Sequence, residues 1–252
     1  MYNLYCGDCL ELMNQIPDGS VDMIIADPPY NISQDSLSLD RSDFKNKKMA
    51  RKKSVTLDYG EWDKMGRNDF IEFTRKWFYL CTDKLKDGGA FISFFSKQDI
   101  SLLSWIGEEC NVRFRTFFTW VKTNPMPSIY RRNYLSATES IFVGSKGDVG
   151  WTFNFTRQED MHNVWVGPNK SVYGVTDHPN EKPVDLIAKF VRVHTNENDV
   201  VLDPFMGSGS TGVAAVGLSR DFIGIEESNK WFDVAKGRID LVVKNGVQGE
   251  LF

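Results

Sequence analysis

The sequence has few of the residues that most often bind metals, and it lacks a long apolar run. Its 252 residues include only four cysteines and three histidines. Cys6 and Cys9 form a C-x-x-C pair, but a zinc site needs two further ligands, so we predict no metal site. The low cysteine content is typical of a reducing compartment rather than of a disulfide-stabilised protein. Without a signal-peptide pattern or a membrane-spanning run, we expect a cytoplasmic protein that makes no membrane contact.

The chain also lacks an excess of positive charge, because its formal net charge is −4. Overall charge therefore does not indicate a nucleic-acid-binding protein, but the basic residues are unevenly distributed. Residues 45–53, KNKKMARKK, contain six Lys or Arg residues in nine positions. A second group consists of Arg113, Arg115, Lys122, Arg131 and Arg132. Such groups are either solvated surface loops or surfaces that follow phosphates, and both interpretations stay open at this point.

Apolar runs predict seven strands, and segments with helical spacing alternate with most of them. We expect strands at residues 2–6, 21–26, 88–96, 113–122, 139–146, 199–203 and 222–226. Helices are expected at residues 9–16, 70–85, 183–191, 211–218 and 229–242. This alternation predicts an α/β fold with a mostly parallel, seven-stranded sheet and helices on both faces. Two segments do not follow it: a basic mobile loop at 31–57, and an insertion outside the sheet at 147–177.

Four of the predicted strands lead into an acidic residue, namely Asp8, Asp27, Asp203 and Glu226. Each acid by itself has a simple structural explanation as a helix cap or a turn residue. Ligands of open α/β sheets bind beyond the carboxyl ends of the strands, so parallel strands would bring all four acids to one edge. If the first strand lies beside the last, the fold is a circularly permuted Rossmann-like domain.

A glycine-rich loop, VLDPFMGSGSTG, follows the sixth predicted strand. Gly207, Gly209 and Gly212 have the G-x-G-x-x-G spacing, and Glu226 lies nineteen residues beyond the first glycine. This pattern is the fingerprint of a dinucleotide-binding loop. A P-loop is excluded, because the loop has no lysine to contact phosphates.

The loop nevertheless suits S-adenosylmethionine better than a dinucleotide. Four residues, Asp203 to Met206 (DPFM), precede the first glycine, and an acid there would sit poorly beside a pyrophosphate. S-adenosylmethionine has no phosphate but carries an ammonium and a sulfonium group, so the acid is favourable. Glu226 can accept hydrogen bonds from its ribose hydroxyls, and Asp8 from its adenine amino group. On these residues alone, an NAD(P)-dependent oxidoreductase remains the alternative.

The tetrapeptide DPPY, Asp27 to Tyr30, ends the second predicted strand. By itself it is a strand-ending turn. Together with the glycine loop it resembles the amino-methyltransferases of nucleic acids, specifically the permuted beta class, in which DPPY precedes the glycine motif. The resemblance covers nearly the whole chain, through GDCLELM, VDMIIADPPYN, GGAFISFFS, TESIFVGSK, NVWVGP, HPNEKP and VLDPFMGSGSTG. HPNEKP departs from the more usual H-P-T-Q-K-P at Asn180 and Glu181.

The resemblance implies a site-specific, adenine-N6 DNA methyltransferase with a circularly permuted Rossmann-like fold and S-adenosylmethionine as its cofactor. The Asp27 carboxylate and the Pro28 carbonyl would each accept an N–H of the target amino group, and Pro29 would hold them rigidly. Tyr30 would stack on the base, which must first leave the duplex. The cofactor-binding residues would be Asp8, Cys9, Lys182, Asp203, Pro204, Phe205, Gly207, Ser208, Gly209, Ser210, Thr211 and Glu226.

Double-stranded DNA is therefore the expected macromolecular partner. Residues 147–177 are the candidate target-recognition insertion, although Trp151, Phe153 and Phe155 there could equally be core residues of a small hairpin. The resemblance also makes a homodimer and a cognate restriction endonuclease or partner subunit possible, in a bacterial, archaeal or phage-encoded system. The expected DNA-contacting residues are Lys45, Lys47, Lys48, Arg51, Lys52, Lys53, Lys122, Arg131 and Arg132.

Three alternatives to adenine-N6 methylation remain. The first is cytosine-N4 methylation, for which the family typically has Ser in place of Asp27. The second is the NAD(P)-dependent oxidoreductase. The third is a non-catalytic DNA-binding subunit with a methyltransferase-like fold, which the presence of both motifs disfavours.

Overall fold

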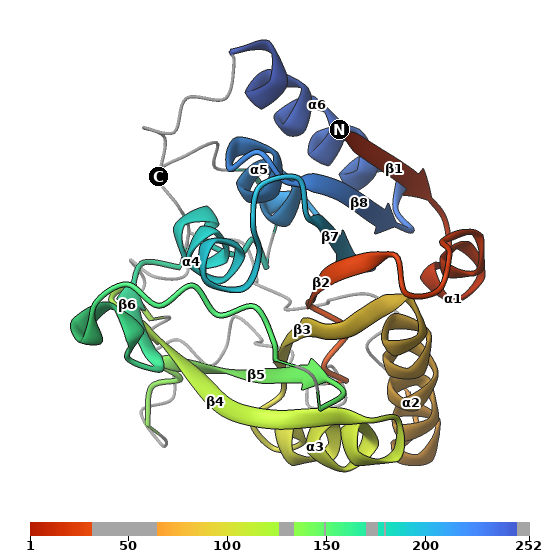
Figure 1. Cartoon of the computed structure of the whole chain (residues 1–252), viewed down its shortest axis with the longest axis vertical. Helices are drawn as coiled ribbons and strands as arrows, with labels where there is room; N and C mark the ends of the chain where they lie inside the picture. Colours follow the sequence, from red (N-terminus) through yellow and green to blue (C-terminus); the bar gives the residue numbers. More distant parts are fainter. Residues whose placement is uncertain (32–64, 126–133, 149, 170–175, 179, 246–252) are drawn as a thin grey trace, which may run out of the picture. The chain divides into compact units, whose positions relative to one another are not determined.

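The computed structural model describes residues 1–31, 65–125, 134–148, 150–169, 176–178 and 180–245 (Figure 1). The chain divides into two compact units, residues 1–28 with 75–252 and residues 29–74. In the smaller unit, the side-chain amide of Asn31 exchanges two hydrogen bonds, of 2.9 and 2.8 Å, with the backbone of Met65. Helix α2 (Arg67–Lys84) begins in the smaller unit and ends in the larger one.

An eight-stranded sheet forms the centre of the larger unit, and its order is β1-β8-β7-β2-β3-β5-β4-β6. Among the described strands, only β5 runs antiparallel to its neighbours. The mostly parallel α/β sheet is therefore confirmed, with eight strands instead of seven. The strands are β1 (Tyr2–Cys6), β2 (Val21–Ala26), β3 (Leu85–Phe95), β4 (Val112–Lys122), β5 (Thr138–Lys146), β6 (Val164–Gly167), β7 (Val200–Asp203) and β8 (Asp221–Glu226).

The first and last strands of the chain are neighbours in this sheet. β1 pairs in parallel with β8, with Leu4 opposite Gly224 and Cys6 opposite Glu226. β8 continues to β7, and β7 to β2, again in parallel. The N-terminal strand thus occupies the position beside the glycine-loop unit that a permuted fold requires.

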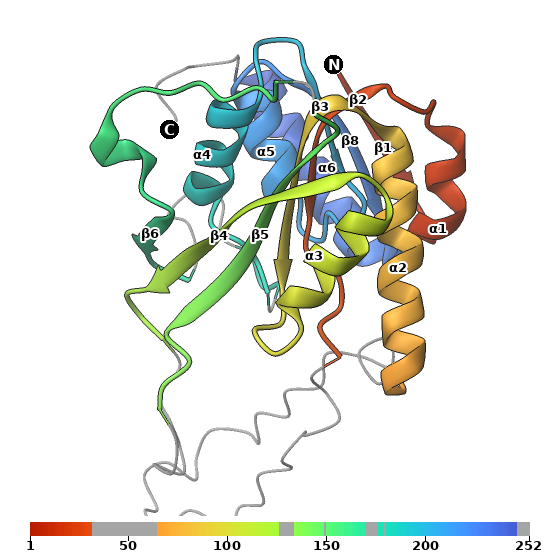
Figure 2. The same ribbon diagram turned by 60° about the horizontal axis from the view of Figure 1, so that its bottom comes forward.

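Helices cover both faces of the sheet, as Figures 1 and 2 show. α4 (Val184–His194), α5 (Ser210–Gly217) and α6 (Asn229–Lys244) lie on one side, and α1 (Cys9–Leu12), α2 and α3 (Ile100–Glu109) on the other. Helix α4, expected at residues 183–191, buries Leu186, Ile187, Phe190 and Val191, which share one face at helical spacing. Helix α3 was not predicted. Of the described helices, none is both long and apolar enough to cross a bilayer.

The expectation that residues 147–177 form an insertion outside the sheet is wrong for β6. Residues 164–167 pair in parallel with residues 119–122 of β4, at the edge of the sheet. The strand has only four residues, and Val164 and Val166 are exposed, so the sequence carries no signal of a buried strand.

Earlier in the same segment, two aromatic side chains contact His194 of α4. The ring centroids of Trp151 and Phe153 lie 4.8 and 5.5 Å from that of His194.

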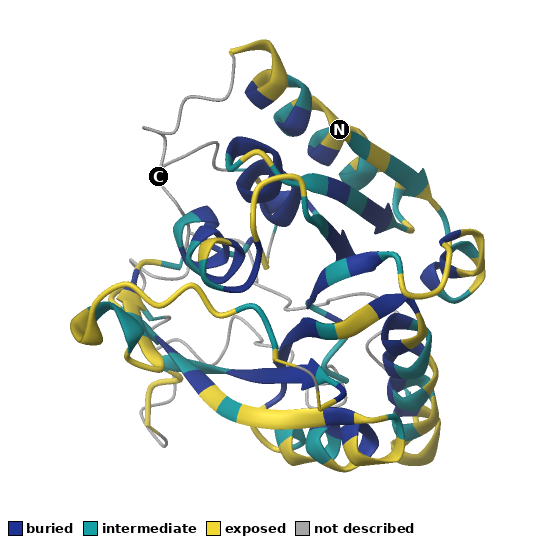
Figure 3. Cartoon of the chain, viewed as in Figure 1, coloured by how far each residue is buried: buried dark blue, intermediate teal, exposed yellow. Residues whose placement is uncertain are grey.

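An aromatic cluster fills the core between the sheet and α2, where buried residues concentrate (Figure 3). Phe78 stacks on Phe91 of β3 with 4.1 Å between ring centroids, and Phe142 of β5 lies edge-on to both. Trp77 meets the ring of Phe205 edge-on at 5.7 Å. Fully burying one such side chain stabilises a fold by about 1.5–3 kcal/mol. The core therefore directly supports the loop that follows β7.

Candidate functional site

Four neighbouring parallel strands bring the predicted acids to one edge of the sheet. β1, β8, β7 and β2 lie side by side and run in the same direction. Asp203 and Glu226 end β7 and β8, Asp27 follows β2 directly, and Asp8 lies two residues beyond β1. The expected common edge is confirmed.

The backbone of the glycine loop lies so close to neighbouring elements that side chains at its glycines would not fit. Gly207 and Gly209 have φ of +49° and +83°, in the left-handed region that favours glycine. A Cβ atom on Gly209 would lie 2.8 Å from that of Ala235, so α6 packs directly on the loop backbone. The Gly207 amide donates to Glu226 Oε2 (2.9 Å), and the Ser228 amide to Oε1 (2.9 Å). Glu226 thus braces the loop, and each carboxylate oxygen keeps a lone pair for a ligand.

Asp203 lies buried beneath the same loop. Its Oδ1 accepts from the Phe205 amide (2.9 Å) and its Oδ2 from the Thr211 hydroxyl (2.6 Å). Burial raises the pKa of Asp203 to about 7; these two hydrogen bonds oppose the rise, and the negative charges of Asp27 and Glu226 add to it. A cation bound at this edge would favour the ionised carboxylate.

The donors and acceptors around the loop suit a cationic ligand better than a phosphate. Of the four acids at the edge, Asp27 and Glu226 lie near enough to Asp203 to influence it, and the loop contains no lysine. The hydroxyl of Ser210 is buried and has no hydrogen-bond partner among the described residues. Buried polar groups nearly always have a partner, so this one indicates a place for a ligand. S-adenosylmethionine, with its ammonium and sulfonium groups, fits this set.

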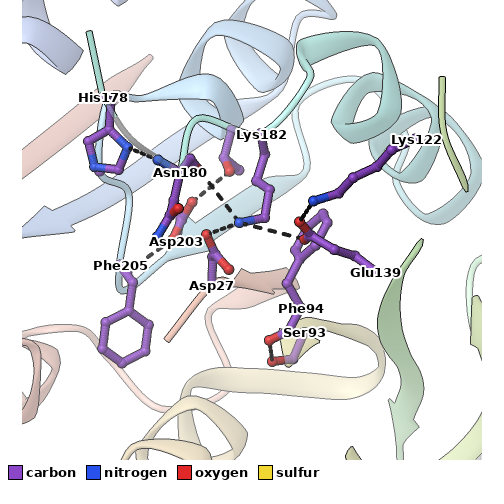
Figure 4. Close-up of polar contacts among 12 residues, drawn as sticks. Asp27, Ser93, Phe94, Lys122, Glu139, His178, Asn180, Lys182, Asp203 and Phe205 are labelled. Atoms are coloured by element: carbon purple, nitrogen blue, oxygen red, sulfur yellow. Dashed lines mark hydrogen bonds and ion pairs between the residues drawn. The ribbon is translucent and has the colours of Figure 1, made fainter. Parts of the chain in front are cut away.

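Lys182 joins the catalytic candidate Asp27 to a second acid, Glu139 (Figure 4). Its ammonium pairs with Asp27 Oδ2, lies 3.9 Å from Glu139 Oε2 and stands 5.1 Å from the centre of the Phe94 ring. Lys122 pairs with Glu139 from the other side at 2.6 Å. Burial opposes the charge of Lys182, but the carboxylates of Asp27 and Glu139 outweigh it and raise the pKa of Lys182. The side chain is therefore an ammonium.

This network gives two of the predicted site residues unexpected partners. Lys182 was expected to bind the cofactor, and here it contacts the carboxylate of Asp27. Lys122 was expected to contact DNA, but it is paired with Glu139 and only 18% of its side chain is exposed, so that role stays a prediction. The other predicted DNA contacts lie outside the described residues; they are Lys45, Lys47, Lys48, Arg51, Lys52, Lys53, Arg131 and Arg132.

The remaining predicted residues divide between the two units. Asp8 caps helix α1 by accepting from the Leu10 amide (2.8 Å). Burial raises the pKa of the adjacent Cys9 to about 12, so its thiol stays protonated. Pro29 and Tyr30 belong to the smaller unit, and their roles stay predictions. Among the described residues, no group of three or more His, Cys, Asp or Glu side chains could hold a metal.

A buried ion pair that the sequence reasoning missed fastens the glycine loop. Glu181 accepts from the Thr176 amide (2.8 Å) and lies 3.5 Å from Arg238 Nη2. Arg238 Nη1 donates to the Ser208 carbonyl at 2.7 Å. The Glu181 side chain is fully buried, and that of Arg238 is 10% exposed. The only sequence signal was the departure of Glu181 from the usual motif, and nothing pointed to Arg238.

His178 approaches the loop from the same segment. A Cβ atom on Gly207 would lie 3.3 Å from His178 Nε2, and the imidazole meets the Trp231 ring edge-on at 4.5 Å. The absence of a side chain at Gly207 is thus what permits this contact. His178 and helix α6 thus both lie directly against the glycine loop.

Comparison with known proteins agrees with this geometry. A family model described as DNA methylase, N6_N4_Mtase, matches residues 21–237. The type II methyltransferase M2.MboI of Moraxella bovis is 32% identical, over 97% of this chain and 90% of the relative. M2.DpnII of Streptococcus pneumoniae is 31% identical, over 92% and 87%.

Solved structures of methyltransferases share the fold. M1.HpyAVI, solved as its SAM complex, superposes with a TM-score of 0.73 and 29% identity, covering 95% of this chain and 100% of that one. PvuII DNA methyltransferase, which is cytosine-N4-specific, superposes with a TM-score of 0.71 at 19% identity, covering 96% and 90%. The expected methyltransferase fold is confirmed.

Proposed function

Because this chain belongs to the DNA methylase family, we propose that it transfers the methyl group of S-adenosylmethionine to the exocyclic N6 of adenine in double-stranded DNA. The expected enzyme class and cofactor are confirmed by the family and its relatives. They lend no support to the dinucleotide oxidoreductase. Asp27 in the DPPY motif favours adenine over cytosine as the target.

One observation carries the proposal most directly: the DPPY strand and the glycine-loop strand are neighbours. β2 pairs with β7 in parallel, with Met23 opposite Val201 and Ile24 opposite Leu202. Asp27 and the loop after Asp203 therefore emerge at the same edge, although about 180 residues separate them in the chain. Methyl transfer requires the methyl donor and the target base to be held close together. The shared edge would bring the donor at the glycine loop close to the base at Asp27.

The residues of the chain have separable roles in this reaction. S-adenosylmethionine, when bound, supplies an electrophilic methyl group. Glu226, Ser210 and the loop amides would hold it, and Asp203 would face its positive charge. The Asp27 carboxylate would accept one N–H of the target amino group and hold the nitrogen lone pair toward the methyl group. The Pro28 carbonyl would accept the other N–H.

The target base must leave the duplex to reach Asp27, which costs a few kcal/mol in base-flipping enzymes generally. Cations that neutralise phosphates would offset part of this cost. We assign this role to the basic stretch 45–53, and target recognition to residues 147–177. The relatives M2.MboI and M2.DpnII are type II methyltransferases, so we also propose a cytoplasmic restriction–modification role with a cognate endonuclease. Homodimer formation stays a prediction.

Incubation of the purified protein with tritiated S-adenosylmethionine and mixed-sequence duplex DNA tests the function. Nucleoside chromatography should then detect N6-methyladenine, and sequencing of modified bases should give the recognition site. N4-methylcytosine would reassign the target base. Tight DNA binding without any methyl incorporation would favour the non-catalytic alternative.

A further inference from the structure

Glu139 has an unusual position for a buried acid. It is the second residue of β5 and lies opposite Trp120 of β4. One carboxylate oxygen, Oε1, pairs with Lys122 at 2.6 Å. The other, Oε2, is buried and has no hydrogen-bond partner in the described part of the chain, and the ammonium of Lys182 lies 3.9 Å away (Figure 4). A buried acceptor without a hydrogen bond lowers the stability of the fold, so the presence of Glu139 at this position calls for an explanation.

Opposite charges are paired around this oxygen. Asp27 and Glu139 supply two negative charges, Lys182 and Lys122 supply two positive ones, and Lys97 adds further positive charge near Glu139. Burial by itself would raise the pKa of Glu139, but Lys182 and Lys122 outweigh it and lower that pKa. Both acids of this network are thus paired with ammonium groups in a partly desolvated site, where charge interactions are strong.

The proposed reaction changes this distribution of charge. As the bond between the methyl carbon and the amino nitrogen forms, the carbon–sulfur bond breaks and its electron pair stays on sulfur. The positive charge of the sulfonium thereby moves to the amino nitrogen, until that nitrogen releases a proton to Asp27 or to water. An ammonium held on Asp27 would repel the developing charge and compete with the amino group for the carboxylate.

We propose that Glu139 is a positioning residue for methyl transfer, and that it accepts the ammonium of Lys182 when the target amino group binds Asp27. This inference rests on the proposed function. Lys182 carries three N–H donors, so a small movement toward Oε2 completes the missing hydrogen bond. Asp27 then presents its oxygen to the substrate, while the ammonium of Lys182 stays paired with a carboxylate.

Single-turnover methyl transfer with saturating S-adenosylmethionine and DNA tests this role. The variant Glu139→Gln keeps the size of the side chain and removes its charge. We expect its transfer rate to fall roughly 10- to 100-fold, while the Kd for S-adenosylmethionine changes less than about twofold. Glu109→Gln is the matched control, because Glu109 also loses an ion pair, with Arg75, on the exposed end of α3. Its rate should equal that of the wild type.

The variant Lys122→Gln separates a charge role from a merely structural one. Glu139→Gln and Lys122→Gln both remove the Lys122–Glu139 pair. If the pair only supported the fold, methyl transfer would therefore be slower in both variants. If Glu139 acts through charge, Lys122→Gln removes a cation and its rate should rise, opposite to that of Glu139→Gln. This variant also tests the proposal if Glu139→Gln does not fold.

If the wild type is active and Glu139→Gln transfers methyl groups at a rate within twofold of the wild-type rate, the proposed role of Glu139 is wrong. The proposed function would then remain intact. A tenfold slower Lys122→Gln would also overturn it. A wild type that transfers no methyl group to any DNA would instead refute the proposed function itself.

Discussion

The ammonium of Lys182 pairs with the carboxylate of Asp27, although 155 positions separate them in the sequence. The pair joins the HPNEKP segment to the end of β2, beside the strand that leads into the glycine loop. It places a cation on the acid that the proposed reaction requires as an acceptor. In the proposed reaction, the state of this pair would control whether Asp27 can receive the target amino group.

Replacement of Asp27 by Ala should abolish methyl transfer and preserve cofactor binding. Loss of the acceptor should lower the transfer rate by roughly 10²–10³-fold or more, since preorganised acceptors typically contribute that much. Methyl incorporation and calorimetric titration with S-adenosylmethionine measure the two effects separately. Asp233→Ala, at an exposed position of α6, is the control. Undiminished transfer by Asp27→Ala would contradict the mechanism.

The Glu181–Arg238 pair should control cofactor affinity. We expect Arg238→Met to weaken S-adenosylmethionine binding by roughly tenfold, because the Ser208 carbonyl loses its donor and buried Glu181 loses its cation. A double-mutant cycle with Glu181→Gln should give a coupling energy of about 1–2 kcal/mol. Lys236→Met, on the exposed face of the same helix, should have no effect. Additive effects of the two substitutions would show that the pair does not act as a unit.

Cofactor binding should depend on pH through Asp203, whose pKa burial raises to about 7. A cationic ligand binds the ionised carboxylate better, so affinity should rise from pH 6 to pH 8, by up to about tenfold per pH unit below the pKa. Binding near pH 7 should also release protons, which calorimetry in buffers of different ionisation enthalpy detects. The Asp203→Asn variant should lack this dependence. Identical pH profiles for both proteins would assign the effect to another group.

Fold stability should depend on His194 at acidic pH. Burial lowers the pKa of His194 to about 4, from about 6.5 in the unfolded chain. The unfolded state therefore binds more protons between pH 6.5 and 4, so this contribution to stability is present above pH 6.5 and is lost as the pH falls. The total loss is about 3 kcal/mol, from the pKa difference. Urea unfolding at several pH values should show a shallower dependence for His194→Gln.

Neutralising the basic stretch should weaken DNA binding and flatten its salt dependence. With Lys47, Lys48, Lys52 and Lys53 changed to Gln, each lost phosphate contact should reduce the slope of log K against log salt by about 0.9. Filter binding at several salt concentrations measures this slope. A control with the same loss of charge replaces exposed lysines of α2 and α6, namely Lys76, Lys230, Lys236 and Lys244. An unchanged slope would indicate that the stretch is only a solvated segment.

Much of the fold could be predicted because its signals are local. Apolar runs and helical spacing depend on neighbouring residues, and they located β1, β2, β7, β8 and helix α4. The order of the motifs along the chain indicated the permutation, which the pairing of β1 with β8 bears out. β6 was missed because a four-residue edge strand with two exposed valines has no buried pattern to detect.

The sequence by itself determined the acids at the strand ends and the glycines of the loop, since both belong to short motifs in which neighbouring residues define the chemistry. Only the tertiary structure decided the partners of those groups. Glu139 faces Lys182, and Arg238 faces Glu181, because elements distant in the chain pack against one edge of the sheet. Electrostatic pairing depends on separation in space and on burial, and neither quantity is encoded in sequence spacing.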